Sequence, residues 1–261
     1  MARTLEEATA FDAVAPGDDS SRGRNPVRLL FRHVMQARVE ALFRRGDRVL
    51  ALGCGTGEDA LTLAARGIRV VGLDASPERI ARARAKASER GLRPEDCRFE
   101  ALRPEELDAA GSAFDGAYSN FGALSGADLP RTGALLAAAL RPGAAVLISL
   151  LGPWPLPAVI RRALTGMSDP RRGPAPRIER VPLAVSFPTL AQARAALGPG
   201  LEWTDAYALG VLLPGPDHER WVADHPQAFG VLAALERAVR RWPGLRQLGD
   251  HTVLEGRRKG F

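Results

Sequence analysis

The stretch from residue 48 to residue 65 constrains the fold of this chain more than any other. Residues 49–52 (Val-Leu-Ala-Leu) form a short apolar run that is typical of a buried strand. Gly53, Gly55 and Gly57 follow at once, and apolar residues then return at helical spacing. The pattern predicts a strand, a glycine turn and a helix. Because glycine has no Cβ and a helix N-terminus exposes N–H groups, such a turn suits a polar or anionic ligand that lies against the backbone.

A second apolar strand, residues 69–74, supplies the other half of the predicted site. It ends in Asp74, about 20 residues after the turn, which is the spacing at which an acid meets a ribose in nucleotide-binding β-α-β units. Alternatively, Asp74 only caps a helix that begins near Ser76, and the spacing alone does not decide between these roles. A dinucleotide fingerprint needs a glycine where this chain has Glu58, which argues against NAD.

The two stretches VLALGCGTG (49–57) and VVGLDAS (70–76) resemble the first two motifs of the class I S-adenosylmethionine-dependent methyltransferases. The resemblance covers roughly residues 45–150. It implies S-adenosyl-L-methionine as the cofactor and S-adenosyl-L-homocysteine as its product, with Asp74 on the ribose hydroxyls. The other cofactor-binding positions that it implies are Gly53, Cys54, Gly55, Gly57, Ala75, Leu102, Asn120 and Phe121.

Two positions depart from the pattern of that family. The family usually has an acid where this chain has Ala51, and that acid helps to hold the ammonium group of the cofactor. It also often has an acid near Leu102 that binds the adenine amine, whereas here none occurs before Glu105. Losing one charge-assisted hydrogen bond costs about 1.5–3 kcal/mol. Backbone groups or Glu58 are the candidates for compensation.

Strands and helices alternate along the chain, which predicts an α/β fold with a parallel sheet and right-handed crossovers. The resemblance implies a Rossmann-like, seven-stranded sheet of order 3-2-1-4-5-7-6 with an antiparallel last strand. The remaining strands are expected at 97–101, 114–120, 144–151, 201–209 and 251–255, and helices at 26–43, 58–65, 77–90, 129–140, 158–164, 189–197 and 227–241.

We expect one domain over residues 1–261, with a cofactor-binding core at 46–151 completed by 189–210 and 249–261. Residues 1–45 would form an N-terminal cap, in which residues 11–16 fold over the cofactor, or remain a poorly ordered terminus. Residues 152–188 and 211–248 are expected as lid insertions. Because they leave strands at the ligand-bearing edge, they would set the choice of substrate.

Three places supply candidates for catalysis. Asn120 follows the fourth strand, at the edge where open α/β sheets bind ligands, although it could also be a simple turn residue. Methyl transfer from a sulfonium depends mainly on positioning and needs a base only when the acceptor holds its proton tightly. Asp250 and His251 would lie at the mouth of the site, which makes His251 the first candidate base, with His225 and His218 as alternatives. A histidine at a strand start is more often structural.

Composition limits the alternatives. The net charge of +6 and a pI near 10.2 invite a nucleic-acid partner, but the arginines are spread along the chain without an aromatic-interleaved basic motif, so nucleic acid is disfavoured. Arg28, Arg32 and Arg38 lie off the apolar stripe of one helix, which favours a solvated face, although one of them could reach the cofactor carboxylate. Two cysteines indicate neither a disulfide framework nor a metal site. No apolar run approaches a membrane span and the N-terminus is no signal peptide, so we expect a cytoplasmic protein.

These observations favour methyl transfer to a small-molecule acceptor, which Trp154, Trp203 and Trp221 suggest is partly apolar. Residues 119–122 lack an N-P-P-Y-like motif, which argues against enzymes that methylate amino groups of DNA or protein. The alternatives are an RNA methyltransferase and a cofactor-binding protein that has lost catalysis, followed distantly by a nicotinamide enzyme. The sequence does not indicate the oligomeric state.

Overall fold

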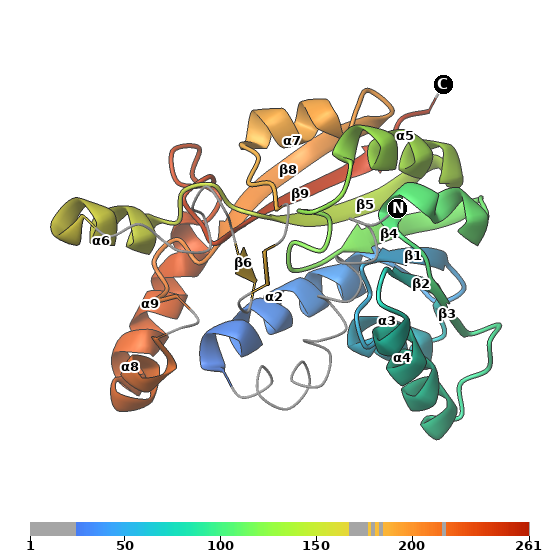
Figure 1. Ribbon diagram of the computed structural model, residues 1–261, viewed down its shortest axis with the longest axis horizontal. Helices are drawn as coiled ribbons and strands as arrows, with labels where there is room; N and C mark the ends of the chain where they lie inside the picture. The colour runs from blue at the N-terminus through green and yellow to red at the C-terminus, as the bar shows by residue number, and fades with distance from the viewer. Residues whose placement is uncertain (1–24, 167–176, 179–180, 183–184, 216–217, 261) are drawn as a thin grey trace.

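The computed structural model describes residues 25–166, 177–178, 181–182, 185–215 and 218–260 (Figure 1). The predicted cap is therefore seen only from residue 25 onward, and its segment 11–16 lies outside the described residues.

A seven-stranded sheet crosses the molecule in the order β3-β2-β1-β4-β5-β9-β8. Strands β3, β2, β1, β4 and β5 pair in parallel, and β9 runs antiparallel to both β5 and β8. The predicted fold class, strand order and antiparallel last strand are confirmed. The bounds are β1 Arg48–Leu52, β2 Arg69–Asp74, β3 Cys97–Ala101, β4 Phe114–Ser119, β5 Leu140–Leu151, β8 Leu201–Leu209 and β9 His251–Arg258.

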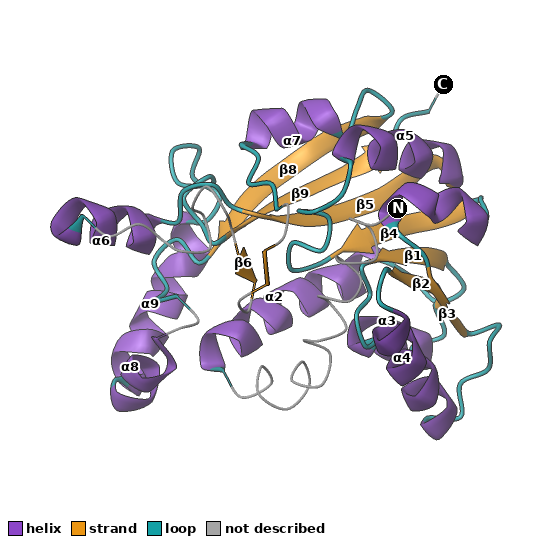
Figure 2. Ribbon diagram, in the orientation of Figure 1, coloured by secondary structure: helices purple, strands orange, loops and turns teal. Residues whose placement is uncertain are grey.

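Helices cover both faces of the sheet, as Figure 2 shows. One face carries α2 (Pro26–Leu42), α3 (Glu58–Ala65) and α4 (Pro77–Glu89), and the other carries η3 (Pro104–Ala110), α5 (Leu129–Ala139) and α7 (Leu190–Ala196). The alternation of β1 follows from this arrangement: Val49 and Ala51 pack into the core below α2 and α3, whereas Leu50 and Leu52 pack into the core beneath α5. Both faces of β1 are buried, which explains its unbroken apolar sequence.

Short polar side chains fix where the helices begin. Asn25 accepts hydrogen bonds from the N–H groups of residues 27 and 28, and Ser76 accepts one from residue 79. Thr189 and Gln192 form a capping box at the start of α7, which confirms the predicted threonine cap.

Some boundaries differ from the prediction. The turn expected at 141–143 is part of β5, which begins at Leu140 and is bulged there, because its pairing with β4 shifts between Phe114 and Gly116. Gly143, at φ +78°, allows the chain to continue through this bulge. The sequence also did not predict the short helices η3 and α8 (Glu219–Asp224), which are too brief to show a helical period.

The remaining elements lie beyond the core. They are α6 (Leu156–Thr165), the two-residue strands β6 (Arg177–Ile178) and β7 (Val181–Pro182), α8, and α9 (Pro226–Val239). In Figure 1, α6 and the pair α8 and α9 lie at the end of the molecule away from β3. Among the residues that the structure describes, no helix is long and apolar enough to cross a bilayer.

Candidate cofactor and acceptor site

The glycine turn after β1 has left-handed backbone at three positions. Gly53, Gly55 and Gly57 have φ values of +68°, +57° and +85°, which side-chain-bearing residues rarely adopt. Their surroundings differ. A Cβ on Gly53 would lie 2.2 Å from Ala123 Cβ, and one on Gly57 would lie 2.8 Å from the Phe99 ring. A Cβ on Gly55 would have no atom of the described residues beyond its chain neighbours within 4 Å. Gly55 is therefore the position of this turn where a ligand can reach the backbone.

Asp74 ties this turn to the end of β2. Its Oδ2 accepts a hydrogen bond from the N–H of Gly55 (2.9 Å), and its Oδ1 accepts one from the N–H of Ser76 (3.0 Å). The side chain that caps α4 belongs to Ser76, so capping that helix is not the role of Asp74. The carboxylate lies beside the open backbone of Gly55, as a ribose-binding acid requires.

Cys54 faces the core with its side chain, so only its backbone is available to a ligand at the glycine turn. Its Sγ lies on the inner side of the turn, 3.0 Å from where a Cβ of Gly72 would be, and packs against the core below the sheet. Burial, and then the nearby charge of Asp74, raise the pKa of Cys54 well above its ordinary value. Its N–H donates to the carbonyl of Leu73 (2.8 Å), which fixes the first residue of the turn on β2.

Asn120 and Phe121 lie at the end of β4, beside the glycine turn. Asn120 is 7% exposed, and its Nδ2 donates to Oδ2 of Asp59 on α3 at 2.7 Å. Its Oδ1 is buried and has no hydrogen-bond partner among the described residues. Phe121 has a left-handed backbone (φ +56°) and is 37% exposed. Sequence reasoning missed Asp59, because an acid in the first turn of a helix is common.

The two departures from the family pattern lie where the topology predicts. Ala51 is fully buried between Gly72 of β2 and Tyr118 of β4, with no polar partner of its own. Leu102 follows β3 at the same sheet edge and packs on the core beneath α5. Ala75 is half-buried directly after β2. Glu58, one candidate for compensation, instead binds Lys86 (2.7 Å) and Arg90 (2.9 Å) of α4.

His251 lies between the end of β4 and a separate cavity. Its ring contacts Phe121 edge-on at a centroid distance of 6.2 Å and Phe31 of α2 at 5.7 Å. Its Nδ1 is 3.3 Å from Oδ2 of Asp250. Both His251 and Asp250 are 7% exposed. The predicted pair therefore lies together, close to Asn120.

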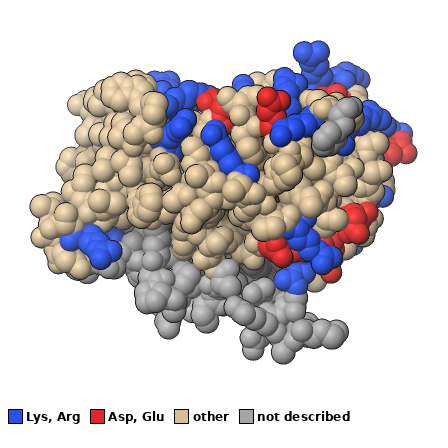
Figure 3. All heavy atoms as spheres, turned by 90° about the horizontal axis from the view of Figure 1, so that it is seen from above, with Lys and Arg blue, Asp and Glu red and all other residues tan. Residues whose placement is uncertain are grey.

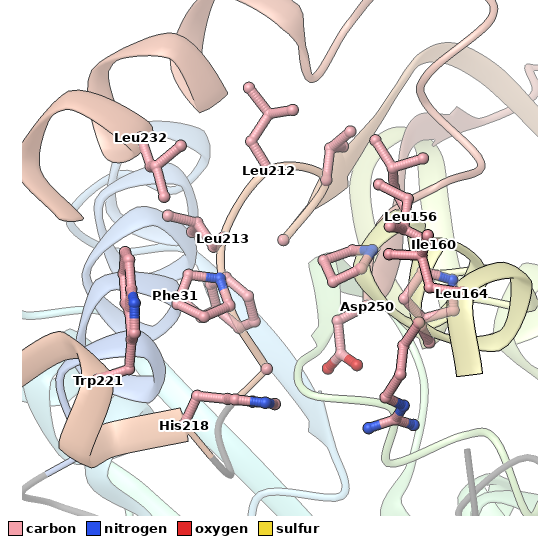
Figure 4. Close-up of a pocket in the computed structure, with 18 of the residues that line it drawn as sticks. Phe31, Leu156, Ile160, Leu164, Leu212, Leu213, His218, Trp221, Leu232 and Asp250 are labelled. Atoms are coloured by element: carbon pink, nitrogen blue, oxygen red, sulfur yellow. The ribbon is translucent and has the colours of Figure 1, made fainter. Parts of the chain in front are cut away.

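The cavity that adjoins this pair measures about 580 Å³. Figure 4 shows its two walls, with Leu156, Ile160 and Leu164 of α6 on one side and Leu213, Trp221 and Phe31 on the other. The Asp250 carboxylate lies between the walls. Titratable groups in the lining are Arg161, His218 and Asp250. The volume and apolar lining suit a small organic molecule.

The two alternative histidines lie farther from the strand ends. His218 is exposed and lines the outer part of the cavity. His225 is exposed and stacks on Trp221 at 5.0 Å between ring centroids. Of the three α2 arginines, Arg38 is bound to Glu255 of β9, whereas the charge of Arg32 acts on Asp59.

These residues fit the cofactor that the resemblance implies. The open backbone at Gly55, with Asp74 beside it, can receive a ribose, and the orphaned Oδ1 of Asn120 requires a hydrogen-bond donor. An adenosine joined to an amino acid supplies both kinds of group. In the described part of the chain, no three His, Cys, Asp or Glu side chains cluster as metal ligands would.

Comparisons with known proteins agree with this fit. Residues 49–143 match the family model described as a methyltransferase domain. A curated relative, the S-adenosyl-L-methionine-dependent Diels-Alderase iccD of Talaromyces variabilis, is 39% identical over 75 residues. That match covers 28% of this chain and only 26% of the relative's length.

Solved structures share the fold over most of the chain. The [4+2]-cyclase SpnF superposes with a TM-score of 0.58 at 22% identity, covering 87% of this chain and 82% of its own. The geranyl diphosphate C-methyltransferase from Streptomyces coelicolor A3(2), solved with Mg2+, geranyl diphosphate and S-adenosyl-L-homocysteine, also has a TM-score of 0.58, at 14% identity. The superposition covers 87% of this chain and 78% of the methyltransferase's chain.

The family match and the sheet order point to the same kind of domain. Residues 49–143 hold the glycine turn, Asp74 and Asn120, and the sheet has the order that the resemblance implies. The domain match and the sheet order support a class I S-adenosylmethionine-dependent methyltransferase, with S-adenosyl-L-methionine as its cofactor.

Proposed function

We propose that this protein transfers a methyl group from S-adenosylmethionine to a small, largely apolar acceptor held in the cavity between α6 and α8. The observation that supports this is the continuity of the site. Phe31 lines the cavity and packs on His251, and the His251 ring also contacts Phe121, next to Asn120 at the cofactor edge. An acceptor in the cavity would thus lie next to the reacting part of the cofactor.

Each group has a proposed task. When bound, the cofactor supplies an electrophilic methyl group on a sulfonium sulfur. Gly55 and Asp74 hold the adenosine, and the cavity walls orient the acceptor and exclude water. His251 takes the acceptor proton through Nε2, because the other ring nitrogen, Nδ1, faces Asp250 at 3.3 Å. The Asp250 carboxylate makes no hydrogen bond to Nδ1 in this structure, and its charge would stabilise the imidazolium that forms.

The expected domain organisation remains part of this proposal. The segments 152–188 and 211–248 would act as lids, since α6 and the 211–215 stretch are the two sides of the cavity. A cytoplasmic location stays a prediction. Against an RNA acceptor, acidic side chains lie among the basic ones on the face shown in Figure 3, so that face has no continuous basic surface for phosphates.

A methyl-transfer assay with a matched pair of variants tests the proposal. Labelled S-adenosylmethionine is incubated with a panel of apolar hydroxyl and amine acceptors, and methylated product and S-adenosylhomocysteine are quantified together. Ile160→Arg places a charge in the cavity wall, so turnover should fall at least tenfold while cofactor affinity stays within twofold. Val159→Arg, one residue away and outside the lining, should change neither.

The rival functions give different results. Turnover only with RNA, lost steeply as salt rises, would identify an RNA methyltransferase. Tight cofactor binding without turnover on any acceptor would indicate that catalysis has been lost. Failure to bind either S-adenosylmethionine or S-adenosylhomocysteine would overturn the proposal.

A second candidate is ring formation with the cofactor bound but not consumed. The apolar lining of the cavity favours it, because a cycloaddition needs shape and exclusion of water more than titratable groups. The names of iccD and SpnF describe such reactions for those proteins. Conversion of a polyene substrate without release of S-adenosylhomocysteine would support this candidate over methyl transfer.

A further inference from the structure

Asp59 and Asn120 form a hydrogen-bonded pair where α3 meets the end of β4. Asp59 is the second residue of α3, directly below the glycine turn, and accepts the 2.7 Å hydrogen bond from Asn120 Nδ2. Because a carboxylate only accepts hydrogen bonds, Asn120 must turn its amide nitrogen toward Asp59. Its Oδ1 therefore faces away from Asp59, and this buried oxygen has no partner among the described residues.

The carboxylate of Asp59 is not neutralised by a salt bridge within the described residues. The pKa of Asp59 is raised above its ordinary value, because the effect of burial exceeds the opposing effects of the Asn120 hydrogen bond and the charge of Arg32. Within the described ranges, neither Asp59 nor Arg32 makes a salt bridge. A carboxylate and an amide oxygen that lack a cation, with a guanidinium nearby on α2, complement the ammonium and carboxylate groups of an α-amino acid.

The positions that sequence reasoning considered do not provide this acid. The side chain of Ala51 has no polar group and is fully buried, next to Tyr118 of β4. Glu58 is held by Lys86 and Arg90 on the far side of α3. Glu58 and Asp59 are neighbours on one helix, so they point about 100° apart, and only Asp59 reaches the end of β4.

We propose that Asp59 and Oδ1 of Asn120 together bind the ammonium group of the amino-acid part of the cofactor, in place of the acid missing at position 51. This inference rests on the proposed function, since it assigns residues to that same cofactor. Asn120 thereby links the cofactor to the neighbouring Phe121, whose ring contacts His251.

A purely structural role would look different. An acid in the first turn of a helix stabilises the positive end of the helix dipole, and Asn120 could simply hold that acid in place. Under this alternative, replacing Asp59 lowers the melting temperature but affects all ligands of the site alike.

Two ligands separate these readings in the full-length protein. S-adenosylhomocysteine carries the amino-acid part, whereas 5′-deoxy-5′-methylthioadenosine has the same adenosine and sulfur without it. Calorimetry with Asp59→Asn should show S-adenosylhomocysteine binding at least tenfold weaker, and methylthioadenosine binding within twofold of wild type. Glu58→Gln, the adjacent acid, is the matched control and should alter neither affinity.

The other possible results of this binding experiment also test the inference. Equal weakening of both ligands in Asp59→Asn, or no weakening of either, would overturn the assignment while leaving the cofactor itself in place. If wild type binds no S-adenosylhomocysteine, the proposed function fails instead. Should Asp59→Asn not fold, Asn120→Ala provides the same comparison, because it removes Oδ1 and should weaken only the ligand with the ammonium group.

Discussion

The carboxylate of Glu236 on α9 accepts a 2.7 Å hydrogen bond from the backbone N–H of Gly210, at the end of β8. It also accepts hydrogen bonds from the next two N–H groups, those of Val211 (3.1 Å) and Leu212 (2.8 Å). Glu236 is 3% exposed, and the three residues that it holds are part of the cavity lining. One buried side chain thus shapes a wall of the proposed acceptor site without touching the acceptor.

Replacing Glu236 with Gln should loosen this wall. An amide presents one accepting oxygen instead of two, so at least one buried N–H loses its partner, at a cost of about 1–3 kcal/mol in the free energy of unfolding. Chemical denaturation measures this loss, and the KM for the acceptor should rise more than kcat falls. Glu202→Gln, on the exposed side of β8, serves as the control. An unchanged denaturation midpoint would contradict the structural account.

Replacing Asp74 with Ala should weaken cofactor binding by about tenfold or more, because the site loses the acceptor for the ribose and the tie to Gly55. Calorimetry with S-adenosylhomocysteine measures the affinity, and circular dichroism checks the fold. Asp108→Asn, on the exposed side of η3, is the comparison variant. Unchanged affinity in a folded Asp74→Ala protein would remove this residue from the site.

The proposed base can be separated from the other histidines. His251→Gln should lower kcat by about 10²–10⁴-fold, the usual contribution of a general base, while S-adenosylhomocysteine affinity stays within twofold. His225→Gln, at the exposed junction of α8 and α9, and His33→Gln, on the exposed side of α2, should retain activity. If His251→Gln were fully active, the acceptor would need no base at this position.

Neither cysteine should react in the folded protein. Burial raises the pKa of Cys97 to about 12, and it also raises the pKa of Cys54 well above its ordinary range. At pH 8 only about one Cys97 in 10⁴ would be a thiolate, the reactive form. A thiol reagent such as DTNB should therefore label neither residue until guanidinium unfolds the chain, when both react. Rapid labelling of one thiol at pH 8 without denaturant would show that its surroundings are open.

The same shifts predict weaker folding in alkaline solution. The folded state keeps the Cys97 proton up to a pH of about 12, whereas the unfolded chain releases it near pH 8.5–9. Stability from this group is complete below the unfolded pKa and is lost as pH rises through the interval to 12. Burial raises the pKa of Tyr118 and Tyr207 as well, which adds to the trend. Denaturation at pH 8 and pH 10.5 measures it, and equal stability at both would contradict it.

Local patterns were sufficient for the cofactor half of the fold. The β1 run, the glycine turn and Asp74 lie within 27 consecutive residues, 48–74, and their order alone implies the parallel β-α-β unit. The position of His251 was also predictable, since the last strand must start at the ligand-bearing edge once the strand order is known.

The roles of Asp59 and Glu236 and the position of the cavity depend on long-range packing, which the sequence pattern did not reveal. Asp59 reads as an ordinary acid in a first helical turn, and only the meeting of α3 with the end of β4 joins it to Asn120. Glu236 lies in a helical pattern that leaves its burial open, because its partners are 24 to 26 residues earlier in the chain. The cavity depends on how α6 and α8 face each other, which no local periodicity encodes.

The position of β9 between β5 and β8 also determines the order in which the strands can pair during synthesis. Among the strands that the structure describes, β8 pairs with β9 alone, and β9 begins about 40 residues after β8 ends. Strands β1 to β5 can associate as they emerge, since their contacts are closer in sequence, whereas β8 must wait for residues 251–258. The cofactor half of the molecule can thus form during synthesis, and the half that receives the acceptor closes only when β9 inserts between β5 and β8.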